Sequence, residues 1–143
     1  MRILLLLVSA LLAAPAAAQE LGARTASPDQ TLGNMAASDP EAEIEEVAAA
    51  AAAHPLGTLE NPVRVGGPEG ARAYILRLRC SDGSRPALGP HHPGAVGVYG
   101  TVTEAYPLDC GAAAPGRVTL IVDLYHEEHR EDRPAAGFAI DPS

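Results

Sequence analysis

Residues 118–125 have the sequence Val118-Thr119-Leu120-Ile121-Val122-Asp123-Leu124-Tyr125. Large apolar residues occupy every second position of this stretch, namely Val118, Leu120, Val122 and Leu124. An alternation of period two among β-branched and aliphatic residues is typical of a strand that buries one face. The sequence therefore predicts a strand over residues 118–125 with those four side chains directed into the core.

Two further strands are predicted earlier in the chain. The first covers residues 62–65 and is followed by turn-forming residues at 66–70, which are Gly, Gly, Pro, Glu and Gly. The second covers residues 73–80, where Tyr74, Leu76, Leu78 and Cys80 alternate with polar residues and with Ala and Ile. A helix over residues 72–80 remains an alternative, because the same residues have adequate helix propensity.

The region between these strands and residues 118–125 is divided by Pro and Gly. Residues 84–94 contain three Pro and two Gly, which predicts a long exposed loop. A strand is expected from Val96 to about Tyr106, with a bulge or close backbone approach at Gly100. Pro107 should end that strand or confine it to a sheet edge. Near the C-terminus, Phe138 and Ile140 are expected to fold back onto the sheet.

The first eighteen residues have the three parts of a secretory signal peptide. Arg2 is positively charged, residues 3–12 are apolar, and Pro15-Ala16-Ala17-Ala18 supplies the small residues of a cleavage site before Gln19. The apolar run is too short for a membrane span, which needs about 20 residues. We therefore expect an exported, soluble mature chain, periplasmic or secreted, with no membrane span.

Two segments are expected between the signal peptide and the main domain. Residues 19–38 lack any apolar period and predict a disordered leader. Residues 39–55 predict an Ala-rich helix, because Asp39 can cap it, Pro40 suits its first turn, and Pro55 ends it. Ile44 and Val47 are its only large apolar side chains, so it should dock weakly, as a solvated spacer or a partner-binding helix.

Residues 56–143 are expected to form one small α+β domain with a mainly antiparallel sheet. Its two cysteines, Cys80 and Cys110, are predicted to form a disulfide, because an exported chain with an even number of cysteines usually pairs them. Closing the loop of about 30 residues between these two cysteines should stabilise the fold by about 3–4 kcal/mol.

The charge of the chain limits its partners. The whole chain has 10 basic residues, 18 acidic residues and a net charge of −8. Removing residues 1–18 removes Arg2 and no acidic residue, so the net charge becomes −9 (9 minus 18). Nucleic acids and anionic lipids require clustered positive charge, so neither is an expected partner.

Several short sequences resemble a group of small exported proteobacterial proteins of unknown function. The resemblance covers about residues 57–140 and rests on short stretches spread over that range: Asn61-Pro62-Val63-Arg64, Gly67-Pro68-Glu69-Gly70, Ala73-Tyr74, Leu78-Arg79-Cys80-Ser81-Asp82-Gly83, Asp123-Leu124-Tyr125-His126, Pro134 and Gly137-Phe138. It implies an exported, disulfide-containing domain and no particular chemistry.

Histidines are the strongest candidates for chemistry in this sequence. His91 and His92 lie in the Pro-rich loop, and His126 and His129 follow the strand at 118–125 among the carboxylates Glu127, Glu128, Glu131 and Asp132. Imidazoles and carboxylates bind zinc or copper when three or four of them converge. The spacing of His126 and His129 is one residue short of the H-E-x-x-H motif, so a solvated charged turn is the alternative, and we expect no metal and no cofactor.

Catalytic residues are not assigned. Asp123 lies on the strand face opposite the predicted core; if that face were covered, its pKa would shift and it would need a partner such as Arg77 or Arg79. The glycines at 66–70 lack the spacing of a phosphate-binding loop. The sequence therefore favours a binding or structural module of the cell envelope over an enzyme. Its partner is unknown; an envelope protein bound through an exposed sheet edge or the Ala-rich helix is one candidate. A histidine-based metal-binding protein is the alternative.

Overall fold

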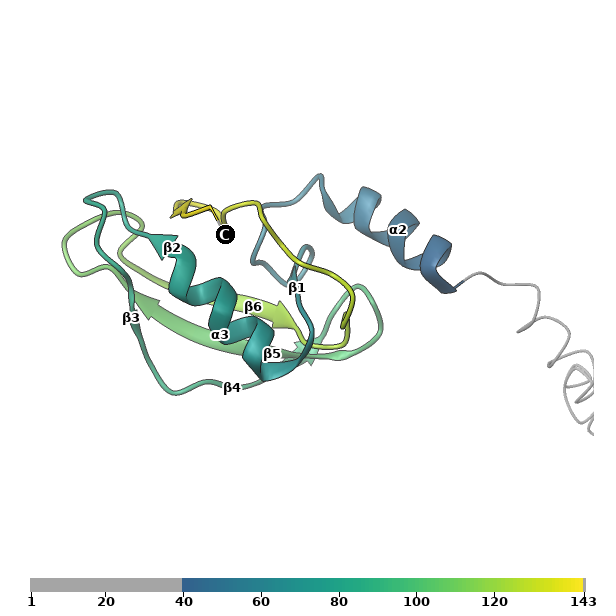
Figure 1. Cartoon of the computed structure of the whole chain (residues 1–143). Helices are drawn as coiled ribbons and strands as arrows, with labels where there is room; N and C mark the ends of the chain where they lie inside the picture. The colour runs from purple at the N-terminus through teal and green to yellow at the C-terminus, as the bar shows by residue number, and fades with distance from the viewer. Residues whose placement is uncertain (1–39, 143) are drawn as a thin grey trace, which may run out of the picture. The chain divides into compact units, whose positions relative to one another are not determined.

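The computed structural model describes residues 40–142, and this part of the chain contains two helices and seven strands (Figure 1). In chain order they are α2 (Pro40–Ala51), β1 (Val63–Arg64), α3 (Gly67–Arg77), β2 (Leu78–Arg79), β3 (Ala87–Leu88), β4 (His92–Val96), β5 (Val102–Asp109), β6 (Arg117–Asp123) and β7 (Ala139–Ile140). The predicted α+β class is confirmed. The predicted signal peptide (1–18) and leader (19–38) lie outside the described residues.

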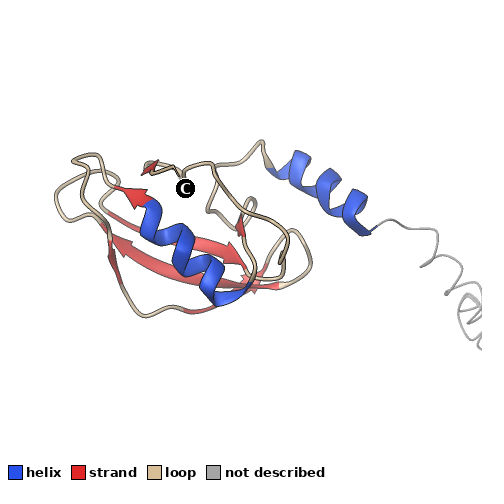
Figure 2. Cartoon of the chain, viewed as in Figure 1, coloured by secondary structure: helices blue, strands red, loops and turns tan. Residues whose placement is uncertain are grey.

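The main sheet is organised around β5 and β6. These strands form an antiparallel pair in which Tyr106 lies opposite Leu120 and Leu108 opposite Val118. β6 pairs on its other side with β1 in parallel, while β3 and β4 both pair with the outer side of β5 in antiparallel fashion (Figure 2). The sheet is therefore mainly antiparallel, as predicted, with one parallel edge strand.

The predicted strand at 118–125 is confirmed as β6, two residues shorter at its C-terminal end. Leu120 and Val122 are buried in the core, and Val118 and Leu124 pack against it while partly exposed. The strand predicted at 62–65 is confirmed as the short β1. Every second side chain of β6 therefore faces the core, as the period of two predicts.

The strand predicted at residues 73–80 is wrong, and the helix alternative is nearer the structure. Residues 73–77 form the C-terminal part of α3, and Leu78–Arg79 is extended, as β2. Ala71, Tyr74 and Ile75 are buried at helical spacing, whereas Leu76, a predicted core residue, is 52% exposed. Since α3 packs across the core face of the sheet, only the helical spacing can bury this set (Figure 1).

The turn predicted at residues 66–70 is also wrong, because these residues start α3. Gly66 is extended at the N-cap position, and Pro68 occupies the first turn, where its missing N–H leaves no hydrogen bond unmade. Gly66 must be small as well: a Cβ there would lie 2.9 Å from the Cα atom of Glu127. The residues after β6 therefore pass directly over the start of α3.

The single strand predicted from Val96 to Tyr106 is instead a hairpin. β4 and β5 are joined by a tight turn in which the Gly97 amide bonds to the Thr101 carbonyl at 2.9 Å. Gly100 has a φ of +78° and serves this turn rather than a bulge within a strand. The loop predicted at residues 84–94 is also only partly correct, since β3 and the first residues of β4 lie within it.

Pro107 neither ends its strand nor lies at a sheet edge. It sits inside β5 opposite Thr119, between the residues of β5 that pair with β4 and those that pair with β3. Its carbonyl accepts a hydrogen bond from the Gly89 amide at 2.9 Å. The nitrogen and the carbonyl of a strand residue face the same side of the strand. The N–H that Pro107 lacks would therefore point to the same place as its carbonyl, between β3 and β4.

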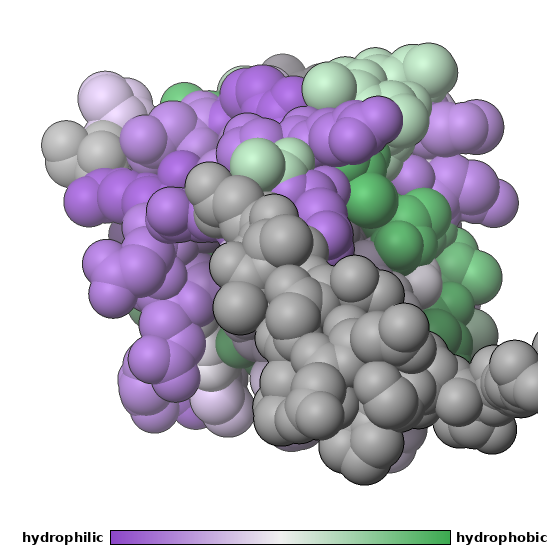
Figure 3. Space-filling view, turned by 90° about the vertical axis from the view of Figure 1, so that its right-hand side faces the viewer, coloured by the Kyte–Doolittle hydropathy of each residue, from purple (hydrophilic) through white to green (hydrophobic). Residues whose placement is uncertain are grey.

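α2 belongs to the same compact unit as the sheet. It ends at Ala51, before the predicted boundary at 55, and Ala51 is its buried residue. Its Glu45 forms a 2.9 Å ion pair with Arg64 of β1. Figure 3 shows this side of the molecule, where hydrophilic side chains predominate and hydrophobic ones form a smaller group at the right. No helix within residues 40–142 is long and apolar enough to cross a membrane.

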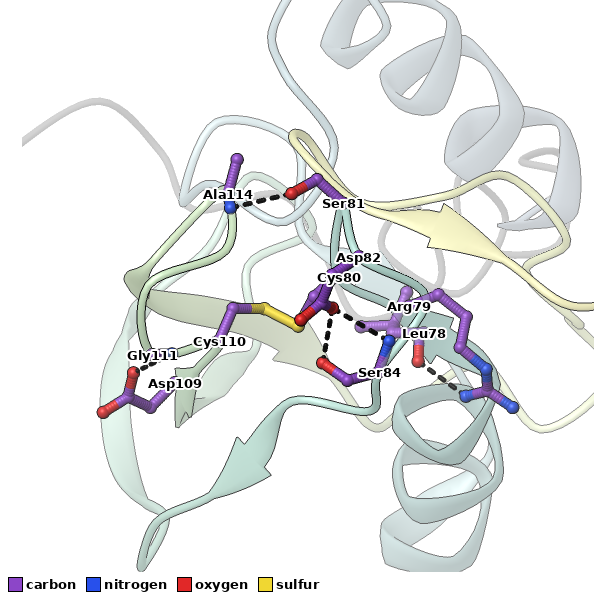
Figure 4. The surroundings of a disulfide bond; sticks show 10 residues. All are labelled: Leu78, Arg79, Cys80, Ser81, Asp82, Ser84, Asp109, Cys110, Gly111 and Ala114. Atoms are coloured by element: carbon purple, nitrogen blue, oxygen red, sulfur yellow. Dashed lines mark hydrogen bonds between the residues drawn. A yellow bond between two sulfur atoms is a disulfide. The ribbon is translucent and has the colours of Figure 1, made fainter.

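The predicted disulfide between Cys80 and Cys110 is confirmed (Figure 4). The two Cα atoms are 5.8 Å apart, within the 4.4–6.8 Å range of protein disulfides. Cys80 follows β2 and Cys110 follows β5, so the bond joins the α3–β2 segment to the main sheet. The Ser81 amide bonds to the Ala114 carbonyl at 2.9 Å, and the Ala114 amide bonds to Ser81 Oγ at 3.0 Å.

The C-terminal segment folds back, as predicted, but it pairs with β2 rather than with the main sheet. Ile140 lies opposite Leu78 in the antiparallel β2–β7 pair. Phe138 is buried in the core, and the Asp141 carboxylate accepts a hydrogen bond from Arg79. The tail thereby covers the end of the core that is next to the disulfide.

Candidate functional site

The four candidate histidines fall into two separate groups. His91 stacks on Tyr106, with ring centroids 5.0 Å apart, and His92 is exposed on β4. His126 and His129 lie together after β6, where His126 packs edge-to-face against Tyr99 at 4.7 Å. Within residues 40–142, no three His, Cys, Asp or Glu side chains are arranged to hold a metal ion.

Residues 126–133 match the solvated charged turn that the sequence offered as an alternative only in part: most of their charged side chains are exposed, but two side chains are buried. His126 and Glu131 are 9% and 4% exposed. The cause is the parallel pairing of β1 with β6, which carries the chain after β6 alongside the residues after β1. The His126 amide accordingly bonds to the Val65 carbonyl at 3.2 Å, and the Gly67 amide to the Leu124 carbonyl at 2.8 Å.

Asp123 is fully buried, and its partners are not the arginines that the sequence suggested. Its carboxylate accepts hydrogen bonds from the Thr101 hydroxyl and, at 3.1 Å, from the Tyr125 amide. His126 Nε2 lies 3.6 Å from Asp123 Oδ1. Burial would raise the pKa of Asp123, but His126, Thr101 and the Tyr125 amide outweigh it and hold that pKa below its ordinary value.

Arg77 and Arg79, the suggested partners of Asp123, are occupied elsewhere. Arg77 pairs with Asp132 at 2.7 Å, and Arg79 pairs with Asp141. Arg77 also donates a hydrogen bond to the Glu131 carbonyl at 3.2 Å. These arginines therefore fasten the chain after β6 to α3 and β2 and take no part in the Asp123 cluster.

A second buried acid lies a few residues further on. Glu131 accepts hydrogen bonds from the Arg133 guanidinium and amide, all between 2.9 and 3.0 Å. Burial raises the pKa of Glu131, but Arg133 outweighs this effect and leaves the pKa lowered. His129 Nε2 lies 3.7 Å from the Glu131 carboxylate, and the pKa of His129 is lowered by burial and by the nearby charge of Arg64.

The chemistry open to these two pairs is limited by their burial. The Nε2 atoms of His126 and His129 are both buried and make no hydrogen bond. The Thr101 hydroxyl donates to Asp123 and is therefore not poised against an imidazole as a nucleophile would be. The geometry suits a structural role in holding residues 123–133 against the rest of the fold.

The arginines that form no ion pair point to a different candidate site. Residues 40–142 contain eight arginines, and six of them pair with carboxylates: Arg64, Arg77, Arg79, Arg117, Arg130 and Arg133. The other two, Arg72 and Arg85, make no ion pair within the described part of the chain. Both line one groove of about 260 Å³, which we call the α3–β3 groove.

The α3–β3 groove is apolar apart from these two arginines. Its other lining residues are Ile75 and Leu76 of α3, and Pro86 and Leu88 of the β3 segment. Ile75 and Pro86 are buried and form the floor, while Leu76 and Leu88 are 52% and 50% exposed and form the sides. The groove can therefore contact an apolar group and an anion at the same time.

Reasoning from the sequence missed this groove because it assigned residues 73–80 to a strand. In a helix, Arg72, Ile75 and Leu76 share one face at spacings of three and four. That signal is present in the sequence, but it has meaning only once the helix is recognised. The pairing of β3 with β5, which brings Arg85 and Leu88 beside α3, has no comparable local signal.

Comparisons of the chain with protein-family models, with curated proteins and with solved structures give no match.

Proposed function

We propose that this chain is an exported binding module of the cell envelope, and that its binding surface is the α3–β3 groove. The observation that carries the proposal is that Arg72 and Arg85, which make no ion pair within residues 40–142, line the groove together with the half-exposed side chains of Leu76 and Leu88. An apolar groove with a few convergent polar groups is the usual form of a binding site. An envelope protein is the kind of partner that we favour.

Export is supported by the signal-peptide pattern of residues 1–18 and by the disulfide between Cys80 and Cys110. Disulfides persist in oxidising compartments and are rare in the cytosol of most organisms. A role in binding is favoured over catalysis because the Asp123–His126 pair is shielded from solvent, with side chains 0% and 6% exposed. With so little exposed surface, this pair is poorly placed to contact a substrate.

Site-specific photo-cross-linking in the periplasm tests this proposal. A photoreactive residue replaces Leu88 in the groove or, as a control, Val98 in the β4–β5 turn, which is 42% exposed. We expect an adduct of defined mass from position 88 that disappears when Arg72→Gln and Arg85→Gln are added, and no such adduct from position 98. Equal cross-linking from both positions, or retention of the chain in the cytoplasm, would contradict the proposal.

A histidine-based metal-binding function is the second candidate. The observation in its favour is that the buried Nε2 atoms of His126 and His129 lack hydrogen-bond partners. Against it, each faces its own carboxylate, Asp123 or Glu131, so the four groups form two pairs rather than one set of ligands. Calorimetric titration with Zn²⁺ and Cu²⁺ tests this function, which requires submicromolar stoichiometric binding that His126→Ala abolishes.

A further inference from the structure

We infer that the α3–β3 groove binds the C-terminal end of a partner polypeptide, with an apolar last residue between Leu76 and Leu88 and its carboxylate at Arg72 and Arg85. This inference rests on the proposed binding function and adds the chemical class of the ligand. The charge, the size and the position of the groove support it.

The charged residues that line the groove are both arginines, which favours an anionic ligand. Residues 40–142 contain fifteen Asp and Glu and eight Arg, and six of these arginines form ion pairs, so an arginine without an ion pair is the exception in this part of the chain. Among the described residues that line the groove there is no carboxylate, and there are two arginines. A guanidinium presents parallel N–H donors that match the two oxygens of a carboxylate, which makes a carboxylate the best-fitting anion.

The apolar lining requires that the anion be attached to an apolar group. Ile75 is 4% exposed and forms a closed floor, so a side chain entering between Leu76 and Leu88 would leave water on most sides. Burying an aliphatic side chain of Leu or Val size there removes apolar surface from water and so stabilises a complex. A free acetate or phosphate ion would leave this part of the groove unused.

The size of the groove favours the end of a chain over a complete small molecule. Its volume of about 260 Å³ lies below the ~300–1,000 Å³ typical of sites that enclose a ligand. A long acyl chain would therefore remain largely exposed to water. A terminal residue needs only its side chain and carboxylate to be covered, because the preceding residues can stay in solvent.

The position of the groove also suits an extended peptide. β3 lies at the edge of the main sheet and pairs with β5 alone among the described strands. Unpaired edge groups can bond to the backbone of an added segment. Pro86 and Pro90 flank β3 and lack N–H donors, so this edge supports a contact of only one or two residues.

Two other hollows lack this combination. One, of about 460 Å³, lies along β3, β5 and β6, but its arginine, Arg117, is paired with Asp109 at 2.8 Å. The hollow between α2 and residues 125–129 is lined by four glutamates, and its arginine, Arg64, is paired with Glu45. Neither offers an unpaired cation beside an apolar floor.

Peptide pools with defined ends provide the test. Four pools of hexapeptides end in Leu, Ile, Val or Phe, are randomised at the preceding positions, and are made with a free C-terminal carboxylate or as the matched amide. Binding to the exported chain is followed by amide chemical-shift changes at Ile75, Leu76 and Leu88. We expect at least one acid pool to bind, and its amide to bind about tenfold or more weakly, because the carboxylate contact is lost.

Two double variants separate a site from general electrostatics. Arg72→Gln with Arg85→Gln should remove binding of the acid pools. Arg117→Gln with Arg130→Gln removes the same charge from arginines whose side chains are 87% and 63% exposed, and it should leave binding unchanged. Equal loss in both variants would overturn the inference, and unchanged melting temperatures would show that all variants are folded.

The remaining outcomes distinguish the inference from the proposed function. Binding of sodium decanoate with no binding of any peptide pool would replace the peptide end by a fatty acid and overturn the inference. Failure of every acid pool, together with an Arg72- and Arg85-dependent cross-link from position 88, would also overturn it while leaving the proposed function standing.

Discussion

His126 Nε2 lies 3.6 Å from Asp123 Oδ1, and neither side chain is more than 6% exposed. The two residues close the turn that follows β6, with the Tyr125 amide bonded to the same Asp123 oxygen at 3.1 Å. Thr101, in the turn between β4 and β5, bonds to the other oxygen. A single carboxylate therefore ties the β4–β5 turn to the chain after β6.

Asp123→Ala should lower the free energy of unfolding by about 2–4 kcal/mol, because it leaves the Thr101 hydroxyl and the Tyr125 amide without their acceptor. Asp132→Ala is the matched control: it removes the ion pair between Asp132 and Arg77, but the Asp132 side chain is 61% exposed. Exposed pairs contribute about 1 kcal/mol or less. Urea unfolding measures both variants, and equal losses would show that Asp123 does not hold the two segments together.

His129 should make stability depend on pH. Its pKa in the folded chain is lowered from the ordinary value of 6.5, by burial and by Arg64. The unfolded chain then binds more protons between the lowered and the ordinary pKa, so the free energy of unfolding falls as the pH drops through about 6.5. His129→Gln should reduce this dependence between about pH 7.5 and 5.5.

The exposed His92 provides the control for this measurement, since His92→Gln removes an imidazole from the surface of β4. Urea unfolding at several pH values gives the slope for each variant. A slope in His129→Gln as steep as that of the parent chain and of His92→Gln would contradict the role of His129.

Sequence reasoning succeeded where local periodicity and tertiary structure agree. Val118, Leu120 and Val122 alternate in a way that only a strand can bury, and the cysteines needed only an even count and an exported chain. Tyr74 and Leu78 are four residues apart, a spacing that fits both a strand and a helix, so the alternation at 73–80 was ambiguous. Ile75, buried in α3, distinguishes the two structures.

The candidate sites were less accessible to sequence reasoning, because they depend on contacts between distant segments. The burial of His126 and Glu131 follows from the parallel pairing of β1 with β6, which no local pattern indicates. The α3–β3 groove depends on a helix next to a two-residue strand, and β3 is too short to leave a periodic signal. Unpaired arginines can be recognised only after every ion pair is known.

The signal-peptide interpretation predicts the mature N-terminus. Signal peptidase should cleave after Ala18, because small residues at 16–18 follow the apolar run and Pro15. Intact-mass analysis of protein purified from the periplasm should give a chain that begins at or within a few residues of Gln19. Recovery of the chain with Met1 still present in the membrane fraction would contradict export and release.

Replacing Cys80 and Cys110 together by Ser should lower the free energy of unfolding without changing the fold. The bond closes a loop with a sequence separation of 30, and the chain-entropy relation gives about 3–4 kcal/mol for such a loop. β2 should be the first element to loosen, because Cys80 follows it directly; its remaining ties are its pairing with β7, the Arg79–Asp141 ion pair and the buried side chain of Leu78.

Urea unfolding measures the loss in the double variant, and hydrogen exchange at Leu78 and Arg79 locates it. Ser81→Ala provides the control: it removes the side-chain acceptor of the Ala114 amide next to the disulfide but keeps the covalent link. Ser81→Ala should lower the free energy of unfolding by only about 1 kcal/mol. Two titratable thiols in the native exported chain would show that the bond is absent, and a double variant as stable as the parent would show that it adds nothing to stability.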